Sequence, residues 1–203
     1  MQGPLAAEAE KLGYWGPWGP SIKYDTGGPN AISLNNNGKC VEVHVGSGLL
    51  YYRVGKVDFA KNAISWGTST QYDAGGPNAI SMDDNGQCVE VHVEPGDPFG
   101  VLYYRVGKVN FAKNTISWGT NSQYDTGGPN SISMDNNGQC IEVHVGTEIL
   151  YSRVGKANFA QKTISWEPST RYDVGGSNSV SMNDSIRCVE VHAETNNLYY
   201  RVR

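Results

Sequence analysis

Hydrophobic and polar residues alternate along short stretches of this chain, and the alternation recurs in four copies. The stretch Cys88-Val89-Glu90-Val91-His92 is one example. Period-two alternation is typical of a β-strand, in which successive side chains point to opposite faces. The same pattern begins at Cys40, Cys88, Cys140 and Cys188, with spacings of 48, 52 and 48 residues. The sequence therefore predicts four structural repeats.

Each repeat is expected to hold four short antiparallel strands. In the second copy these are predicted at 78–82, 87–93, 101–109 and 115–118. Asn85-Gly86 separates the first two strands, and Asn-Gly strongly favours a tight hairpin. Four short strands in a repeat of this length are typical of a propeller blade. We therefore predict an all-β fold, a four-bladed β-propeller.

The ends of the chain suggest how the blades close. Residues 1–13 are expected to be an N-terminal tail, and residues 14–203 a single propeller domain. Its inner strands are predicted to start near residues 30, 78, 130 and 178. The segment 14–24 resembles a fourth strand, and the chain finishes on a third strand, 198–202. The N-terminal strand is thus predicted to complete the last blade and close the ring. Half of an eight-bladed ring, made by a dimer, remains the alternative.

The composition and charge of the chain argue against some classes of binding partner. The chain has 203 residues, 25 glycines and 18% charged residues, as turn-rich β proteins do. A net charge of −4 and the lack of a basic cluster argue against nucleic acid. No apolar run reaches the ~18 residues that span a bilayer, so no membrane span is expected. No secretory signal is seen, and four free cysteines would suit a cytoplasmic or non-classically secreted protein.

The Cys-x-Glu-x-His pattern invites a zinc site, because thiolate, carboxylate and imidazole all bind zinc. However, side chains two apart on a strand run parallel, ~7 Å from each other, and do not converge on one ion. We interpret Glu90 and His92 as part of a structural cluster with Arg105, since an unpaired buried charge costs several kcal/mol. The cysteines are interpreted as small buried residues, too far apart for disulfides. No metal or other cofactor is expected.

The segment that joins one blade to the next carries the candidate binding chemistry. Each copy, such as 66–78, contains a Trp, a Tyr-Asp pair, two glycines and an Asn. Asp and Asn can take paired sugar hydroxyls, and an aromatic ring can cover the apolar patch of a sugar. The same residues could instead make turns and inter-blade core. The predicted carbohydrate-binding residues are Asp25, Asp73, Asp125, Asp173, Tyr24, Tyr72, Tyr124, Tyr172, Trp18, Trp66, Trp118, Trp166, Asn30, Asn78, Asn130 and Asn178.

The chain lacks the motifs of common enzyme classes. It has no serine nucleophile elbow, phosphate loop or zinc-enzyme motif. An active site usually needs a unique constellation, whereas repeated blades favour multivalent binding, in which weak sites add up. The protein is therefore predicted not to be an enzyme.

Over residues 14–203 the chain resembles the tandem-repeat β-propeller lectins of bacteria and fungi. The residues that carry the likeness are the Pro-Asn-Ala-Ile-Ser inner strand, the Val-Glu-Val-His strand, the Leu-Tyr-Tyr strand and the aromatic outer strand. The resemblance implies a non-enzymatic lectin with glycans or glycoconjugates as partners, and homo-oligomerisation is left open. Known members mostly have five to seven blades, so four is a departure. The alternatives are a protein-interaction or toxin-targeting module, and a propeller that binds an ion or haem in its axial channel.

Overall fold

The computed structural model describes residues 18–97 and 99–203, and all regular secondary structure in that part is β. The strands form four antiparallel sheets. The first contains β1 (Asn30–Leu34), β2 (Lys39–Gly46), β3 (Leu49–Asp58), β4 (Ala63–Trp66) and β5 (Thr70–Ala74). The second contains β6 (Asn78–Met82), β7 (Gln87–Val93), β8 (Val101–Asn110), β9 (Thr115–Trp118) and β10 (Ser122–Thr126). The third contains β11 (Asn130–Met134), β12 (Gln139–Val145), β13 (Ile149–Asn158), β14 (Thr163–Trp166) and β15 (Thr170–Val174). The fourth contains β16 (Asn178–Met182), β17 (Cys188–Glu194) and β18 (Asn197–Val202).

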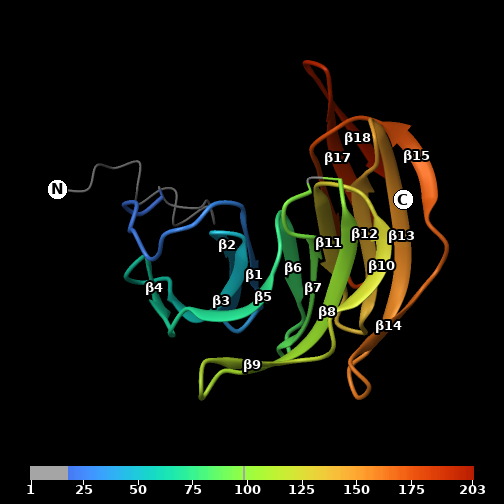
Figure 1. Cartoon of the computed structure of the whole chain (residues 1–203). Coiled ribbons are helices and arrows are strands. Elements are labelled where there is room, and N and C mark those ends of the chain that lie inside the picture. The colour runs from blue at the N-terminus through green and yellow to red at the C-terminus, as the bar shows by residue number, and fades with distance from the viewer. Residues whose placement is uncertain (1–17, 98) are drawn as a thin grey trace.

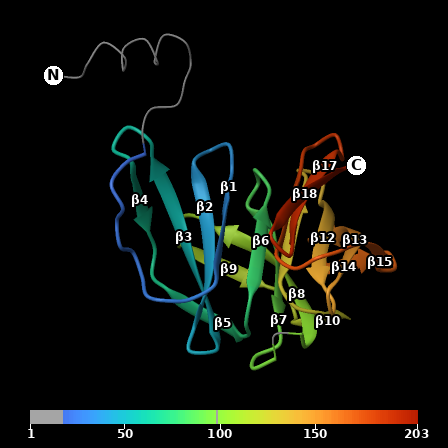
Figure 2. The same cartoon turned by 90° about the horizontal axis from the view of Figure 1, so that it is seen from above.

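The sheets follow one another as blades (Figures 1 and 2). The innermost strands lie side by side in the order β1, β6, β11 and β16. This arrangement confirms the predicted all-β, four-bladed β-propeller. Residues 1–13, the predicted tail, lie outside the described part. No helix among the described residues is long and apolar enough to cross a membrane.

The outer edge of each complete blade is built from two short strands. In the second blade, β9 pairs with one half of the long strand β8 and β10 pairs with the other half. The sequence analysis expected a single outer strand, 115–118, in this blade. The difference arises because β8 has ten residues, so the four-residue β9 leaves half of its edge free for β10.

Neighbouring blades are held by the same contacts at each interface. Valines and a tyrosine on β2 and β3, including Val41, Val43 and Tyr52, pack against Ile80 and Met82 of the next blade. The Met82 amide donates to Ser33 Oγ at 3.0 Å. Equivalent bonds follow at the next two interfaces, Met134 to Ser81 and Met182 to Ser133. The same hydrogen bond between inner strands therefore recurs at each of the three interfaces.

The fourth blade differs from the others. In the described part of the chain it has three strands, and β18 pairs only with β17. Residues 14–17 of the predicted closing strand lie outside that part, and residues 18–24 form no strand. Residues 18–24 lie against the first blade, where Tyr24 stacks on Trp66 with ring centroids 5.2 Å apart.

A local reason for this difference lies at residue 203. The outer tryptophans of the first three blades lie against Gly55, Gly107 and Gly155, where an added Cβ would come within 2.7 Å of the ring or closer. The aligned position of the fourth blade is Arg203. The Arg203 side chain prevents a tryptophan from lying over this position in the same way. Trp18 therefore lacks the glycine contact that the other three outer tryptophans make.

Candidate functional site

A polar cluster lies between successive blades. Between the first and second blades, Arg105 Nε donates to Asp73 Oδ2 at 2.7 Å. His92 Nδ1 is 3.0 Å from Glu90 Oε2, and its Nε2 faces Asp73 at 3.9 Å. Asp73 lies on the outer strand of one blade, and the other three residues lie on the next blade. The cluster therefore links the two sheets.

The same arrangement recurs throughout the chain. Aspartate–arginine pairs join Asp25 to Arg53 at 2.6 Å, Asp125 to Arg153 at 3.4 Å and Asp173 to Arg201 at 2.5 Å. Each buried histidine also contacts its neighbouring glutamate. The expected cluster forms in a different way: Glu and His of each copy contact each other, and three of the four arginines donate from Nε to the preceding aspartate. Arg153 donates instead to the carbonyls of Glu167 and Tyr124, and lies 3.4 Å from Asp125. Sequence spacing could not show a contact between residues about 30 apart.

Burial and neighbouring charges shift the pKa values of several side chains in the cluster. The Arg53 hydrogen bond lowers the pKa of Asp25 to about 2. Burial raises the pKa of Glu142, although hydrogen bonds from His144 and Tyr124 oppose it. Burial disfavours the charged form of His92, but the carboxylates of Glu90 and Asp73 outweigh it and raise its pKa. The Arg201 hydrogen bond likewise lowers the pKa of Asp173, so Asp25 and Asp173 are held as carboxylates beside their arginines.

Most of the predicted sugar-stacking rings are covered. Tyr72 stacks on Trp118 at 5.2 Å and Tyr124 on Trp166 at 5.3 Å, in the core between blades. Trp18 is fully exposed and Tyr24 is 40% exposed. The Tyr72–Trp118 and Tyr124–Trp166 pairs therefore pack between blades and are not open to a sugar.

The predicted asparagines and glycines shape turns. Asn30 and Asn78 begin inner strands, and their side chains donate to the carbonyls of Gly28 and Gly76, two residues earlier. A Cβ at Gly75 would come within 2.9 Å of the His92 ring. Glycine is required there because the chain passes directly over the imidazole.

The two ends of the row of blades present apolar faces. On the first blade, Ile32 is 55% and Leu34 51% exposed, whereas their equivalents Ile80 and Met82 are each 6% exposed. The opposite face, on the fourth blade, exposes Val189, Val191, Tyr200 and Val202. We call these the first-blade face and the fourth-blade face. The sequence did not reveal them, because the same residue types occupy buried positions in the other copies.

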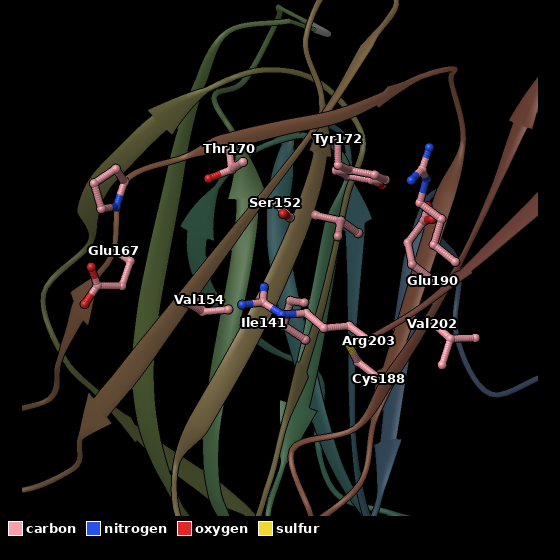
Figure 3. Close-up of a pocket in the computed structure, with 13 residues that line it drawn as sticks. Ile141, Ser152, Val154, Glu167, Thr170, Tyr172, Cys188, Glu190, Val202 and Arg203 are labelled. Carbon is pink, nitrogen blue, oxygen red and sulfur yellow. The ribbon is translucent and has the colours of Figure 1, made fainter.

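A cavity of about 770 Å³ lies between the third and fourth blades (Figure 3). Tyr172, Ser152, Cys188 and Arg203 line it. At the two preceding interfaces, the corresponding space holds the outer tryptophan of the following blade, which packs edge-on against Tyr52 or Tyr104. The cavity thus marks the place where the fourth blade lacks a described outer strand.

A smaller pocket of about 330 Å³ lies on the loop side of the second and third blades. Phe99, from the loop that is longer in the second blade, forms part of its wall together with Asp125 and His144. No group of three or more His, Cys, Asp or Glu side chains in the described ranges is placed to hold a metal ion.

Comparisons with known proteins support the fold. No protein-family model matches the chain, and no curated protein matches it. A crystal structure of a protein from Lactobacillus plantarum is similar, with a TM-score of 0.55 and 9% identity over 86% of this chain and 55% of that one. An oligogalacturonate lyase in complex with manganese is also similar, with a TM-score of 0.43 and 12% identity over 83% of this chain and 49% of that one. The chain thus spans about half the length of these two proteins.

The prediction of a non-enzymatic lectin is corrected by these findings. One of the two structures is named as an enzyme, an oligogalacturonate lyase, and neither is named as a lectin. A TM-score of 0.43 assigns no activity to this chain. The geometry agrees with the correction, since the predicted sugar-binding aspartates are engaged by arginines and three of the four tryptophans are covered by tyrosines.

Proposed function

We propose that this chain is the subunit of a self-assembled β-propeller, in which the fourth-blade face of one copy packs on the first-blade face of the next. One observation carries the proposal. Equivalent residues are buried at three interfaces within the chain and exposed at its two ends. Ile32 and Val191 each belong to half of an interface that the chain builds repeatedly. The two faces are therefore complementary in shape and chemistry.

Polar groups support the same head-to-tail order. At the hairpin tips, the Asn36 amide donates to Asp84, the Asp84 amide to Asn136, and the Asn136 amide to Asp184. Amide and carboxylate side chains thus alternate from blade to blade. Joining the fourth blade to a first blade would place Asp184 beside Asn36 and continue the alternation. Joining two fourth blades would oppose two carboxylates, which is unfavourable.

A pair of copies suits the geometry. The methionine-to-serine hydrogen bond recurs at all three interfaces within the chain, so a second copy can repeat the same contact at a fourth interface. Two copies would supply eight blades, at the upper end of the usual range of about four to eight. Head-to-tail contacts close into a ring when the rotation permits.

Sedimentation equilibrium tests the proposal. We expect twice the chain mass of 22.1 kDa at micromolar concentration. Ile32→Glu and Val191→Glu, one on each face, should each give monomers, because a charge would be buried in the interface. Lys113→Glu, on an exposed loop, is the control and should remain a dimer.

Mixing the two face variants sharpens the test. Each retains one intact face, so together they should form a single interface and a dimer, although neither dimerises alone. A wild-type chain that stays monomeric at every concentration, or a mixture that does not associate, would refute the proposed assembly.

A further inference from the structure

We infer that residues 18–26 of one copy form the outer strand of the fourth blade of a second copy, with Trp18 entering the cavity of Figure 3. This inference rests on the proposed assembly and identifies the segment that completes the interface. It concerns an exchanged strand, whereas the assembly itself requires only the two apolar faces.

The donated segment is already positioned. Gly19 lies against Asn62, where an added Cβ would be 2.7 Å from the Asn62 Cβ, just as Gly67 lies against Asn114 at 2.6 Å. Asp25 is paired with Arg53 as Asp73 is paired with Arg105. Residues 18–26 therefore occupy the place that the outer strand of a preceding blade would occupy, although no preceding blade is present in the described chain.

The receiving strand is open. All six residues of β18 are exposed, whereas its equivalent β8 pairs on its outer side with β9 and β10. In that blade Ser122 lies opposite Tyr104 and Gln123 opposite Tyr103. Transferring this register places Ile22 opposite Tyr200. An exposed strand edge of this kind is a template for pairing with another chain.

The cavity provides a place for the indole. Tyr72 and Tyr124 each stack on the outer tryptophan of the following blade. Tyr172 holds the same position at the third interface, between the third and fourth blades, and lines the cavity, but among the described residues no tryptophan stacks on it. Trp18, at the aligned outer position, is fully exposed. The exposed Trp18 ring is therefore the one expected to fill the stacking position beside Tyr172.

Two residues that depart from the repeat would shift the position of the Trp18 ring in this cavity. Arg203 adds bulk where the other blades have glycine, which prevents the usual position of the tryptophan. Ser152 removes a ring where Tyr52 and Tyr104 pack edge-on against the tryptophans. The indole can therefore shift from Arg203 towards Ser152. Both changes line the same cavity.

The donor and the receiver lie apart within one copy. Residues 18–26 are held on the first blade, and β18 belongs to the last, with the second and third blades between them (Figure 2). Seating the segment in its own cavity would require it to leave the first blade, where Asp25 is paired with Arg53 and Tyr24 stacks on Trp66. A second copy brings its β18 to the segment without such a change.

A cysteine pair tests strand donation. Ile22→Cys with Tyr200→Cys should give a covalent dimer on a non-reducing gel after mild oxidation, because opposed strand positions lie within disulfide reach. Each single variant is a control and should give no cross-link, since the native cysteines are buried. A cross-link within a monomer would show closure in one chain and overturn the inference. The absence of any cross-link would overturn it as well.

Trp18→Ala provides a second measurement. Losing a buried indole should weaken the dimer by about a hundred-fold. The matched control is Phe99→Ala, which removes a half-exposed ring elsewhere and should leave the dimer unchanged. If Trp18→Ala dimerises like the wild type and no cross-link forms, assembly stands and strand donation is rejected. If the wild-type chain never dimerises, both are rejected.

Discussion

Truncating one isoleucine at two equivalent positions should separate folding from assembly. Ile80 is 6% exposed between the first two blades, and Ile32 is 55% exposed on the first-blade face. Ile→Ala removes transfer energy of about 2.4 kcal/mol, at about 0.8 per methylene, and leaves a cavity where the site is closed. Ile80→Ala should thus lower the free energy of unfolding by about 2–5 kcal/mol. Ile32→Ala should lower it by about 1 kcal/mol in the monomer, because less than half of its side chain is covered.

The remaining part of the Ile32 contribution should appear in association. About 1.4 kcal/mol per interface, over two interfaces, corresponds to about a hundred-fold increase in the dissociation constant. Urea unfolding of dilute protein measures the first quantity, and sedimentation velocity over a dilution series measures the second. Equal unfolding costs for both variants in the monomer, or an unchanged dissociation constant for Ile32→Ala, would refute the reasoning.

Other predictions concern the clusters, the thiols and the turns. Arg105→Met should lower the free energy of unfolding by about 3 kcal/mol, because it strands Asp73 in a partly buried site, whereas Lys61→Met, at an exposed pair, should cost less than about 1 kcal/mol in the same urea titration. The pKa of Asp25, about 2 beside Arg53, should return towards 3.8 in Arg53→Met, as followed by NMR. Because the folded-state pKa is lowered, this ion pair stabilises the fold above about pH 4 and its contribution is lost as pH falls towards 2. Burial raises the pKa of Cys40 to about 11 and that of Cys140 to about 12, so neither should react with a thiol reagent at pH 8 until urea unfolds the chain; rapid reaction of either in native protein would contradict this. Ile186 has φ 62°, where the other three hairpins have glycine, so Ile186→Gly should raise the free energy of unfolding by about 1 kcal/mol in a urea titration, and a lowered free energy would contradict it.

Strand positions could be predicted because each depends on local alternation and turn chemistry. The second-copy strands were expected at 78–82 and 87–93 and are observed there. Gly38, Gly86 and Gly138 adopt positive φ, as their hairpins require. Four copies of one pattern then determine the number of blades. The split outer strand was missed, because it depends on the length of the neighbouring strand.

Contacts within the site could be predicted only where they are local. Glu90 and His92 are two residues apart and were expected to share one polar cluster, although the ideal strand spacing did not show that their side chains touch. The Asp73–Arg105 pair joins different blades, and its formation depends on the rotation between sheets. A signal for the aromatic stacks was present, because the outer Trp precedes the Tyr by six residues in every copy. This constant spacing suits a packing role, since neighbouring copies must present both rings in register.

The repeats make the end faces interpretable, because each blade is a control for the others. A residue such as Ile32 is exposed for a reason that composition cannot give, since Ile80 in the same local sequence is buried. Ile80 is covered by a neighbouring blade, and Ile32 has no blade against it. The exposure of Ile32 therefore reflects the absence of a covering blade and not a difference in residue type. The divergent residues strengthen this argument. Ser152 and Arg203 line one cavity, and Ile186 belongs to the same terminal blade as Arg203. Ser152, Ile186 and Arg203 thus depart from the repeat in or beside the last interface and the fourth blade, at the end of the row that lacks a following blade.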